Sequence, residues 1–151
     1  TSWDFDGQDI FKRAVAGMVG ASNQVLDDMG LSVADIDLVV PHQANSRIID
    51  AVGRKLGVST NRIFVNVERY GNMSAATVLV ALVEAIEQGY VQASSKILLP
   101  AFGAGLTWNS HLVQWGDRIT PLATSDIELP PCDETASLCD ARDNLAIRDQ
   151  R

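Results

Sequence analysis

The stretch Asp37-Leu38-Val39-Val40-Pro41-His42 predicts a short buried strand that ends at the proline. Residues 45–56 follow directly, with apolar side chains at helical spacing, and Gly57 is a typical residue at which a helix ends. A strand that leads at once into a helix is typical of α/β architecture. His42 is therefore expected at the C-terminal end of a strand.

The sequence on both sides continues this alternation. The patterns predict further helices at 7–29 and 74–88, strands at 63–67, 96–101 and 106–115, and a glycine-rich loop at 102–105. Ser74 is the expected N-cap of the third helix, and Gly89 is expected to end it. Strands that alternate with helices indicate an α/β fold class.

One predicted helix is apolar on every side. Residues 75–83 read Ala-Ala-Thr-Val-Leu-Val-Ala-Leu-Val, and such a helix is buried all round. The other elements of the chain suffice to cover one side of it. We therefore expect something outside this chain to cover the remainder.

Composition excludes several classes of protein. A hydrophobic content of 46% indicates a packed globular domain, and a net charge of −7 argues against general binding to nucleic acid. No apolar run is long enough for a membrane span and no signal peptide is visible, so we expect a cytoplasmic protein with no membrane partner. Because the chain starts at Thr1 without a methionine, we expect it to be processed, cleaved or cut from a longer polypeptide.

The last part of the chain has a different texture. Residues 120–151 contain three prolines, few apolar groups and an excess of acidic residues, which predicts an acidic tail, either disordered or with a short helix at 135–148. Cys132 and Cys139 lie there among carboxylates, which raise a thiol pKa and oppose use as a nucleophile. We interpret both as ordinary tail cysteines, and expect no metal site.

Two neutral hydrogen-bond donors stand beside predicted element ends, His42 and Asn72. An imidazole N–H and an amide N–H that converge on one oxygen stabilise developing negative charge without bringing a full positive charge. Loss of carbon dioxide from a malonyl thioester places such a charge on the thioester oxygen. In the simpler interpretation, His42 caps a strand and Asn72 is a turn residue that tolerates positive φ.

The motifs resemble one known family. From about residue 5 to 116 the chain is similar to the C-terminal half of β-ketoacyl-acyl-carrier-protein synthase III, in the motifs Pro41-His42-Gln43-Ala44-Asn45, Arg47-Ile48-Ile49, Gly71-Asn72-Met73-Ser74-Ala75-Ala76 and Ala101-Phe102-Gly103-Ala104-Gly105-Leu106-Thr107-Trp108. This resemblance implies a thiolase-like fold, in which two α/β halves form a five-layer αβαβα architecture with mixed sheets and a buried central helix in each half. Residues 1–119 would be one such half, followed by the tail at 120–151.

The resemblance also implies a reaction. In the family, a Cys-His-Asn triad joins an acyl group taken from an acyl coenzyme A to malonyl-acyl-carrier protein, with loss of carbon dioxide, at the start of fatty acid synthesis. His42 and Asn72 match the histidine and asparagine. The cysteine belongs to the N-terminal half, so that half is an expected partner, and the complete enzyme is expected to be a homodimer. The backbone N–H near Ala104 would serve a second oxyanion hole. No cofactor is bound permanently, and the coenzyme A thioester is a substrate.

A basic strip on this acidic chain predicts where a partner docks. On a helical wheel Arg47, Arg54 and Lys55 lie away from the apolar face, and these positions together with Lys12 match residues with which the family receives the acidic acyl carrier protein. In the alternative interpretation, Asp50 pairs with the two arginines on a solvated helix face. By resemblance, Asn45 holds the water or pantetheine side of the substrate pocket.

Three other functions remain open at this stage. A ketosynthase-like acyltransferase that joins acyl groups to oxygen or nitrogen shares much of the pattern, although the intact pair of His42 and Asn72 favours carbon-carbon bond formation. A non-catalytic half that binds carrier protein or a partner ketosynthase is the second. The third is a hydrolase that uses the amine of Thr1, for which the sequence offers no other support.

Overall fold

The computed structural model describes residues 7–120. Its elements are α1 (Gly7–Asp28), the short 3-10 helix η1 (Val33–Asp35), β1 (Leu38–Val39), α2 (Ser46–Leu56), η2 (Thr60–Arg62), α3 (Val67–Tyr70), α4 (Ala76–Glu87), β2 (Lys96–Gly103) and β3 (Thr107–Gln114). Thr1, both cysteines and the predicted tail helix at 135–148 lie outside the described residues. No helix within 7–120 combines the length and the apolar character needed to cross a membrane.

The described strands form a mixed sheet in the order β1-β2-β3. β1 pairs in parallel with β2, in the register Leu38 with Ile97, and β2 pairs with β3 as an antiparallel hairpin. The hairpin is longer than predicted, because β2 continues through Gly103 and only residues 104–106 make the turn. This sheet confirms the predicted α/β class.

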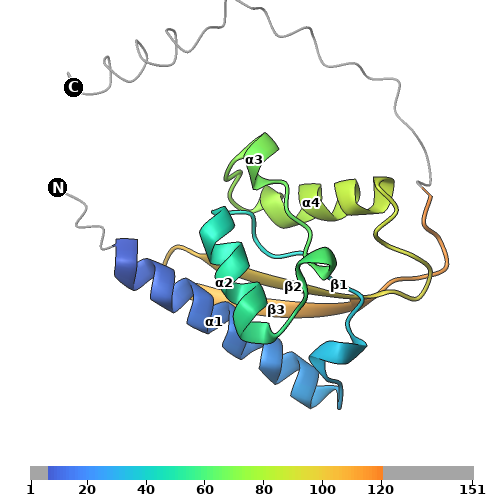
Figure 1. The fold of residues 1–151 in the computed structure, drawn as a ribbon, viewed down its shortest axis with the longest axis horizontal. Helices are drawn as coiled ribbons and strands as arrows, with labels where there is room; N and C mark the ends of the chain where they lie inside the picture. The colour runs from blue at the N-terminus through green and yellow to red at the C-terminus, as the bar shows by residue number, and fades with distance from the viewer. Residues whose placement is uncertain (1–6, 121–151) are drawn as a thin grey trace, which may run out of the picture. The chain divides into compact units, whose positions relative to one another are not determined.

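Successive residues of the strands face opposite layers, as the period of two requires. Val39 packs with α1 and α2 in one hydrophobic cluster, whereas Leu38 and Val40 pack with α4 in another. Figure 1 shows α4 above the sheet and α1 below it. The chain therefore buries both faces of the sheet at β1, which is why β1 has no polar residue, whereas several residues of β3 are exposed.

The apolar helix α4 is covered on one side only. Thr77, Ala81 and Ala85 are fully buried against the sheet, while Leu79 is 65% exposed and Val83 54% exposed. Small residues face the sheet and large aliphatic residues face outward, the reverse of a helix designed to meet water. The expectation that this chain covers one side of the helix and leaves the other is confirmed.

Two local predictions are wrong. The strand predicted at 63–67 is reduced to a single bridge between Val39 and Ile63, because the backbone N–H of Asn66 donates to the Gln43 side chain (2.9 Å) and the chain then turns into α3. Ser74 is not the N-cap of α4: Ala75 occupies that position, and Ser74 has a left-handed φ of 56°.

Candidate active site

The backbone of the sheet places His42. Beyond the end of β1, Val40 N–H donates to Leu98 O (2.9 Å) and His42 N–H donates to Pro100 O (2.8 Å). Pro41 lies between them and has no backbone N–H. In a parallel pair the N–H at this position would not bond to β2, so the proline costs no hydrogen bond between the strands. The proline thus ends the strand without releasing the histidine from the sheet, as the sequence predicted.

The imidazole of His42 is held in its neutral form. Burial lowers the pKa of His42 below its ordinary value of 6.5, because desolvation disfavours the charged ring. Nδ1 of the ring lies 2.5 Å from Oγ1 of Thr77, in the first turn of α4. A neutral imidazole at pH 7 provides one N–H donor and no full charge.

The turn before α4 places Asn72. Gly71 has φ 65° and ψ −162°, a conformation that glycine alone adopts without strain. The Asn72 side chain then folds back, and its Oδ1 accepts a hydrogen bond from Ser74 N–H (2.9 Å). Because a backbone N–H only donates, this contact identifies the oxygen end of the amide. The Nδ2 end carries two N–H donors, which this contact leaves available.

The conformation of Gly71 leads to a stability prediction. Gly71→Ala is expected to destabilise the fold by about 1–3 kcal/mol, because a Cβ is strained at this φ and ψ although the space around it is open. Gly20→Ala is the matched control, since Gly20 also has open space but lies within α1, where alanine is expected to add about 0.5–1 kcal/mol. Melting temperatures from circular dichroism should move in opposite directions. Equal shifts would contradict the role assigned to the Gly71 backbone.

Three of the predicted site groups meet in one open cleft. His42, Asn72 and Ala104 all line it, although His42 follows β1, Asn72 precedes α4 and Ala104 lies in the turn between β2 and β3. Ala104 is not among the residues with positive φ, so the alanine fits the turn without strain. The cleft thus combines neutral side-chain donors with a turn of exposed backbone.

An aromatic wall also lines this cleft. Trp108 is the second residue of β3 and lies against α1, where a Cβ at Gly17 would come within 2.6 Å of the indole ring. Gly17 therefore makes room for the ring, yet 51% of Trp108 stays exposed. Its exposed part gives the cleft an apolar side together with Phe102 and Ile48.

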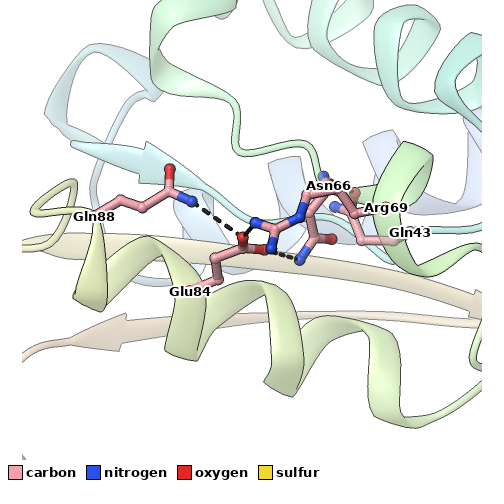
Figure 2. A network of polar contacts seen from close by, with 5 residues as sticks. All are labelled: Gln43, Asn66, Arg69, Glu84 and Gln88. Carbon is pink, nitrogen blue, oxygen red and sulfur yellow. Dashed lines mark hydrogen bonds and ion pairs between the residues drawn. The ribbon is translucent and has the colours of Figure 1, made fainter. Parts of the chain in front are cut away.

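A buried polar network anchors the turn that carries His42 (Figure 2). Gln43 is fully buried; its Nε2 donates to Pro41 O (2.8 Å) and Phe64 O (3.2 Å), and its Oε1 accepts from Asn66 N–H. The Asn66 amide then donates to Oε2 of Glu84 on α4 (2.7 Å). Side-chain groups here replace the backbone partners that a regular strand would supply.

Glu84 ends this network inside α4. Its other oxygen, Oε1, accepts hydrogen bonds from Arg69 and from Gln88, as Figure 2 shows. A carboxylate on a buried helix face is costly unless several donors surround it. The network therefore explains the buried acidic residue of α4, whose other acidic residue, Glu87, is exposed.

The family model described as 3-oxoacyl-(acyl-carrier-protein) synthase III C terminal matches residues 26–115. The chain belongs to this family. Among curated relatives, β-ketoacyl-(acyl-carrier-protein) synthase III 2 of Vibrio cholerae is 54% identical over 135 residues, which cover 89% of this chain and 37% of that protein. The Vibrio vulnificus protein of the same name is 50% identical over 150 residues, 93% of this chain and 41% of that protein.

Solved structures of the family share the fold. The synthase III of Pseudomonas aeruginosa PAO1 matches with a TM-score of 0.74 and 38% identity over 78% of this chain and 37% of that chain. The synthase III of Aquifex aeolicus VF5 gives a TM-score of 0.72 and 42% identity over 74% of this chain and 36% of that chain. The thiolase-like fold class that the motifs implied is confirmed. The chain spans about two fifths of the length of the curated synthase III relatives it matches.

Most of the predicted basic strip lies in one groove between α1 and α2. Lys12, Arg47 and Arg54 line this basic groove, together with Phe11 and Asp50. Within residues 7–120, neither recorded ion pair involves Asp50, so the alternative in which it neutralises the arginines is not seen. Lys55 is exposed on α2 but does not line the groove.

The structure gives Asn45 a structural contact instead of a place in the cleft. It is the N-cap of α2, where its Oδ1 accepts from Arg47 N–H (2.9 Å), and it does not line the cleft. Conversely, sequence reasoning missed Thr77 and Gln43. The available signals were the place of Gln43 inside the histidine motif and of Thr77 inside the apolar run 75–83, but their partners Asn66 and His42 lie 23 and 35 positions away.

Proposed function

We propose that this chain is the malonyl-activating half of a decarboxylating synthase III, which starts fatty acid synthesis. The observation that carries the proposal is that His42 and Asn72 line the same cleft, and that one polar atom of each side chain already makes a hydrogen bond within the chain. The Nδ1 edge of His42 faces Thr77 and the Oδ1 end of Asn72 faces Ser74. Their opposite ends are left to face a substrate oxygen.

The proposed reaction uses these donors at one step. The bond between the α-carbon and the carboxylate of the malonyl thioester breaks, carbon dioxide leaves, and the electron pair remains as an enolate. His42 and Asn72 donate hydrogen bonds to the enolate oxygen. The α-carbon then attacks an acyl-cysteine carbonyl, whose oxyanion the Ala104 N–H receives, and the cysteine thiolate leaves. The names of the curated relatives, β-ketoacyl synthases, support this product class.

The nucleophile requires a second half, because residues 1–131 contain no cysteine. The outward face of α4, where Leu79 and Val83 are 65% and 54% exposed, supports docking of that half, together with Tyr70 of α3, which is 41% exposed and lines the same surface. We refer to the two halves together as the complete enzyme, in one chain or two, and we propose that it is a homodimer. Acyl coenzyme A is its acyl donor.

The pH dependence of carbon dioxide release tests this function. In the complete enzyme, we expect the rate to fall in acid with a midpoint below 6.5, because burial lowers the pKa of His42 and the neutral donor survives to lower pH. His42→Gln keeps a neutral donor that does not titrate. This variant is expected to be slower, and its rate is not expected to fall in the same acidic range. Absence of carbon dioxide release from the complete enzyme would refute the proposed function.

We further propose that the acyl carrier protein docks at the basic groove. Three cations at Lys12, Arg47 and Arg54 line one surface between α1 and α2 on a chain of net charge −7. A local basic surface on an acidic protein directs an acidic partner to one place. The predicted contribution of Lys55 is smaller, because it lies outside the groove.

Charge reversal tests this docking site. Arg54→Glu in the complete enzyme is expected to raise the KM for malonyl carrier protein about tenfold at low salt, while the KM for acyl coenzyme A changes little. Lys55→Glu makes the same charge change one residue away and is expected to give a smaller rise. Equal effects of the two variants would show that net charge, and not the groove, governs binding.

A further inference from the structure

Thr77 is a buried hydroxyl that lies against the ring of His42. It is fully buried in the first turn of α4, and its Oγ1 is 2.5 Å from His42 Nδ1 and 3.3 Å from the backbone N of Gln43. Water does not compete for a group with no exposed surface. The two contacts therefore govern how this hydroxyl is oriented.

The direction of each hydrogen bond follows from the groups involved. The backbone N–H of Gln43 only donates, so Thr77 Oγ1 accepts there. Among residues 7–120, the only other hydrogen-bond partner of the hydroxyl is His42 Nδ1, and no carbonyl accepts its proton. The hydroxyl therefore donates to Nδ1, and a neutral imidazole whose Nδ1 accepts carries its proton on Nε2.

The residue whose backbone N–H donates to Thr77, Gln43, is itself held in place. The Gln43 side chain makes three hydrogen bonds, to Pro41, Phe64 and Asn66, and Figure 2 shows it beside Asn66 in the network that reaches α4. A fixed Gln43 N–H occupies one lone pair of Thr77 Oγ1. The hydroxyl proton is thereby directed to the imidazole and does not rotate freely.

We propose that Thr77 is a positioning residue that holds His42 in the tautomer protonated at Nε2. The ring edge opposite Thr77 then presents a donor to the cleft that His42 lines. The other tautomer would present a lone pair, which repels an enolate oxygen. This inference rests on the proposed function for its consequence in catalysis, but the tautomer itself is a property of the chain that is measured without substrate.

Two substitutions and one spectrum test the proposal. Thr77→Val keeps the shape and removes the hydroxyl, whereas Thr77→Ser keeps the hydroxyl. The complete enzyme labelled with ¹⁵N-histidine is examined by NMR, with His42 assigned by the signals lost in His42→Ala. Wild type and Thr77→Ser should show a protonated Nε2 and an unprotonated Nδ1, while Thr77→Val should populate the other tautomer.

The reaction rates should separate Thr77→Val from Thr77→Ser in the same way as the NMR spectra. For carbon dioxide release, Thr77→Val is expected to lower kcat about 10–100-fold with little change in KM, since a donor to the oxyanion is partly lost. Thr77→Ser is expected to restore most of the rate. Transfer of the acyl group to the cysteine should change little in either variant.

Two results would overturn the proposal: a wild-type His42 protonated at Nδ1, or a Thr77→Val variant that keeps the Nε2 tautomer. The first needs no variant, so a failure of Thr77→Val to fold does not remove the test. A tautomer that shifts as expected in an enzyme that releases no carbon dioxide supports the positioning role of Thr77 and refutes the proposed function instead.

Discussion

Asn72→Ala is expected to slow carbon dioxide release from malonyl carrier protein by about 100–1,000-fold in the complete enzyme, the usual effect of removing one donor from an oxyanion hole. Transfer of the acyl group from coenzyme A to the cysteine should be nearly unchanged, because this step forms no enolate. Single-turnover assays with labelled malonyl and acyl substrates separate the two steps.

Two further variants make this test specific. Asn72→Asp keeps an oxygen to accept from Ser74 N–H, so it preserves the turn while removing the amide donor, and it should be at least as slow as Asn72→Ala. Asn61→Ala, at an exposed asparagine in η2, should behave as wild type. Equal loss of both chemical steps in the Asn72 variants would refute the assigned role.

Gln43→Met is expected to destabilise the fold by about 3–5 kcal/mol, because methionine keeps the volume but leaves three buried backbone groups without a partner. These groups are Pro41 O, Phe64 O and Asn66 N–H. Differential scanning calorimetry should show a much lower melting temperature. The rate of carbon dioxide release should also fall, since the turn that carries His42 loses its anchor.

Gln88→Ala provides the control within the same network. Gln88 is exposed and its side chain makes one hydrogen bond within residues 7–120, to Glu84 (3.1 Å), so the loss of this side chain should cost less than about 0.5 kcal/mol. Figure 2 shows the two glutamines at opposite ends of the network. Similar melting temperatures for Gln43→Met and Gln88→Ala would contradict the anchoring role of Gln43.

Local signals were sufficient wherever neighbours in sequence decide the structure. Pro41 predicted the end of β1, and Gly57 predicted the end of α2, where it adopts a left-handed φ of 72°. The placement of Asn72 just before α4 was also predicted, because Gly71 marks the turn. Each of these outcomes depends on backbone preferences that act over a few residues.

Local signals failed where a side-chain hydrogen bond competed with the expected backbone conformation. Residues 63–67 have the apolar character of a strand, yet Asn66 N–H donates to Gln43, which is 23 positions away. Ser74 is a good N-cap by type, but Asn72 Oδ1 holds its N–H and the residue takes a left-handed φ. Propensity is a weak preference that a side-chain hydrogen bond overrides, whether its partner is distant, as for Asn66, or local, as for Ser74.

The sequence of this chain determined its α/β class, the apolar helix α4 and the two donors at element ends, because periodicity and turn residues encode these directly. The tertiary structure alone decided that His42 meets Thr77 across 35 positions and that Lys12 joins Arg47 and Arg54 in one groove without Lys55. The physical reason is that hydrogen-bond direction and surface grouping depend on distances between elements, which no local pattern specifies.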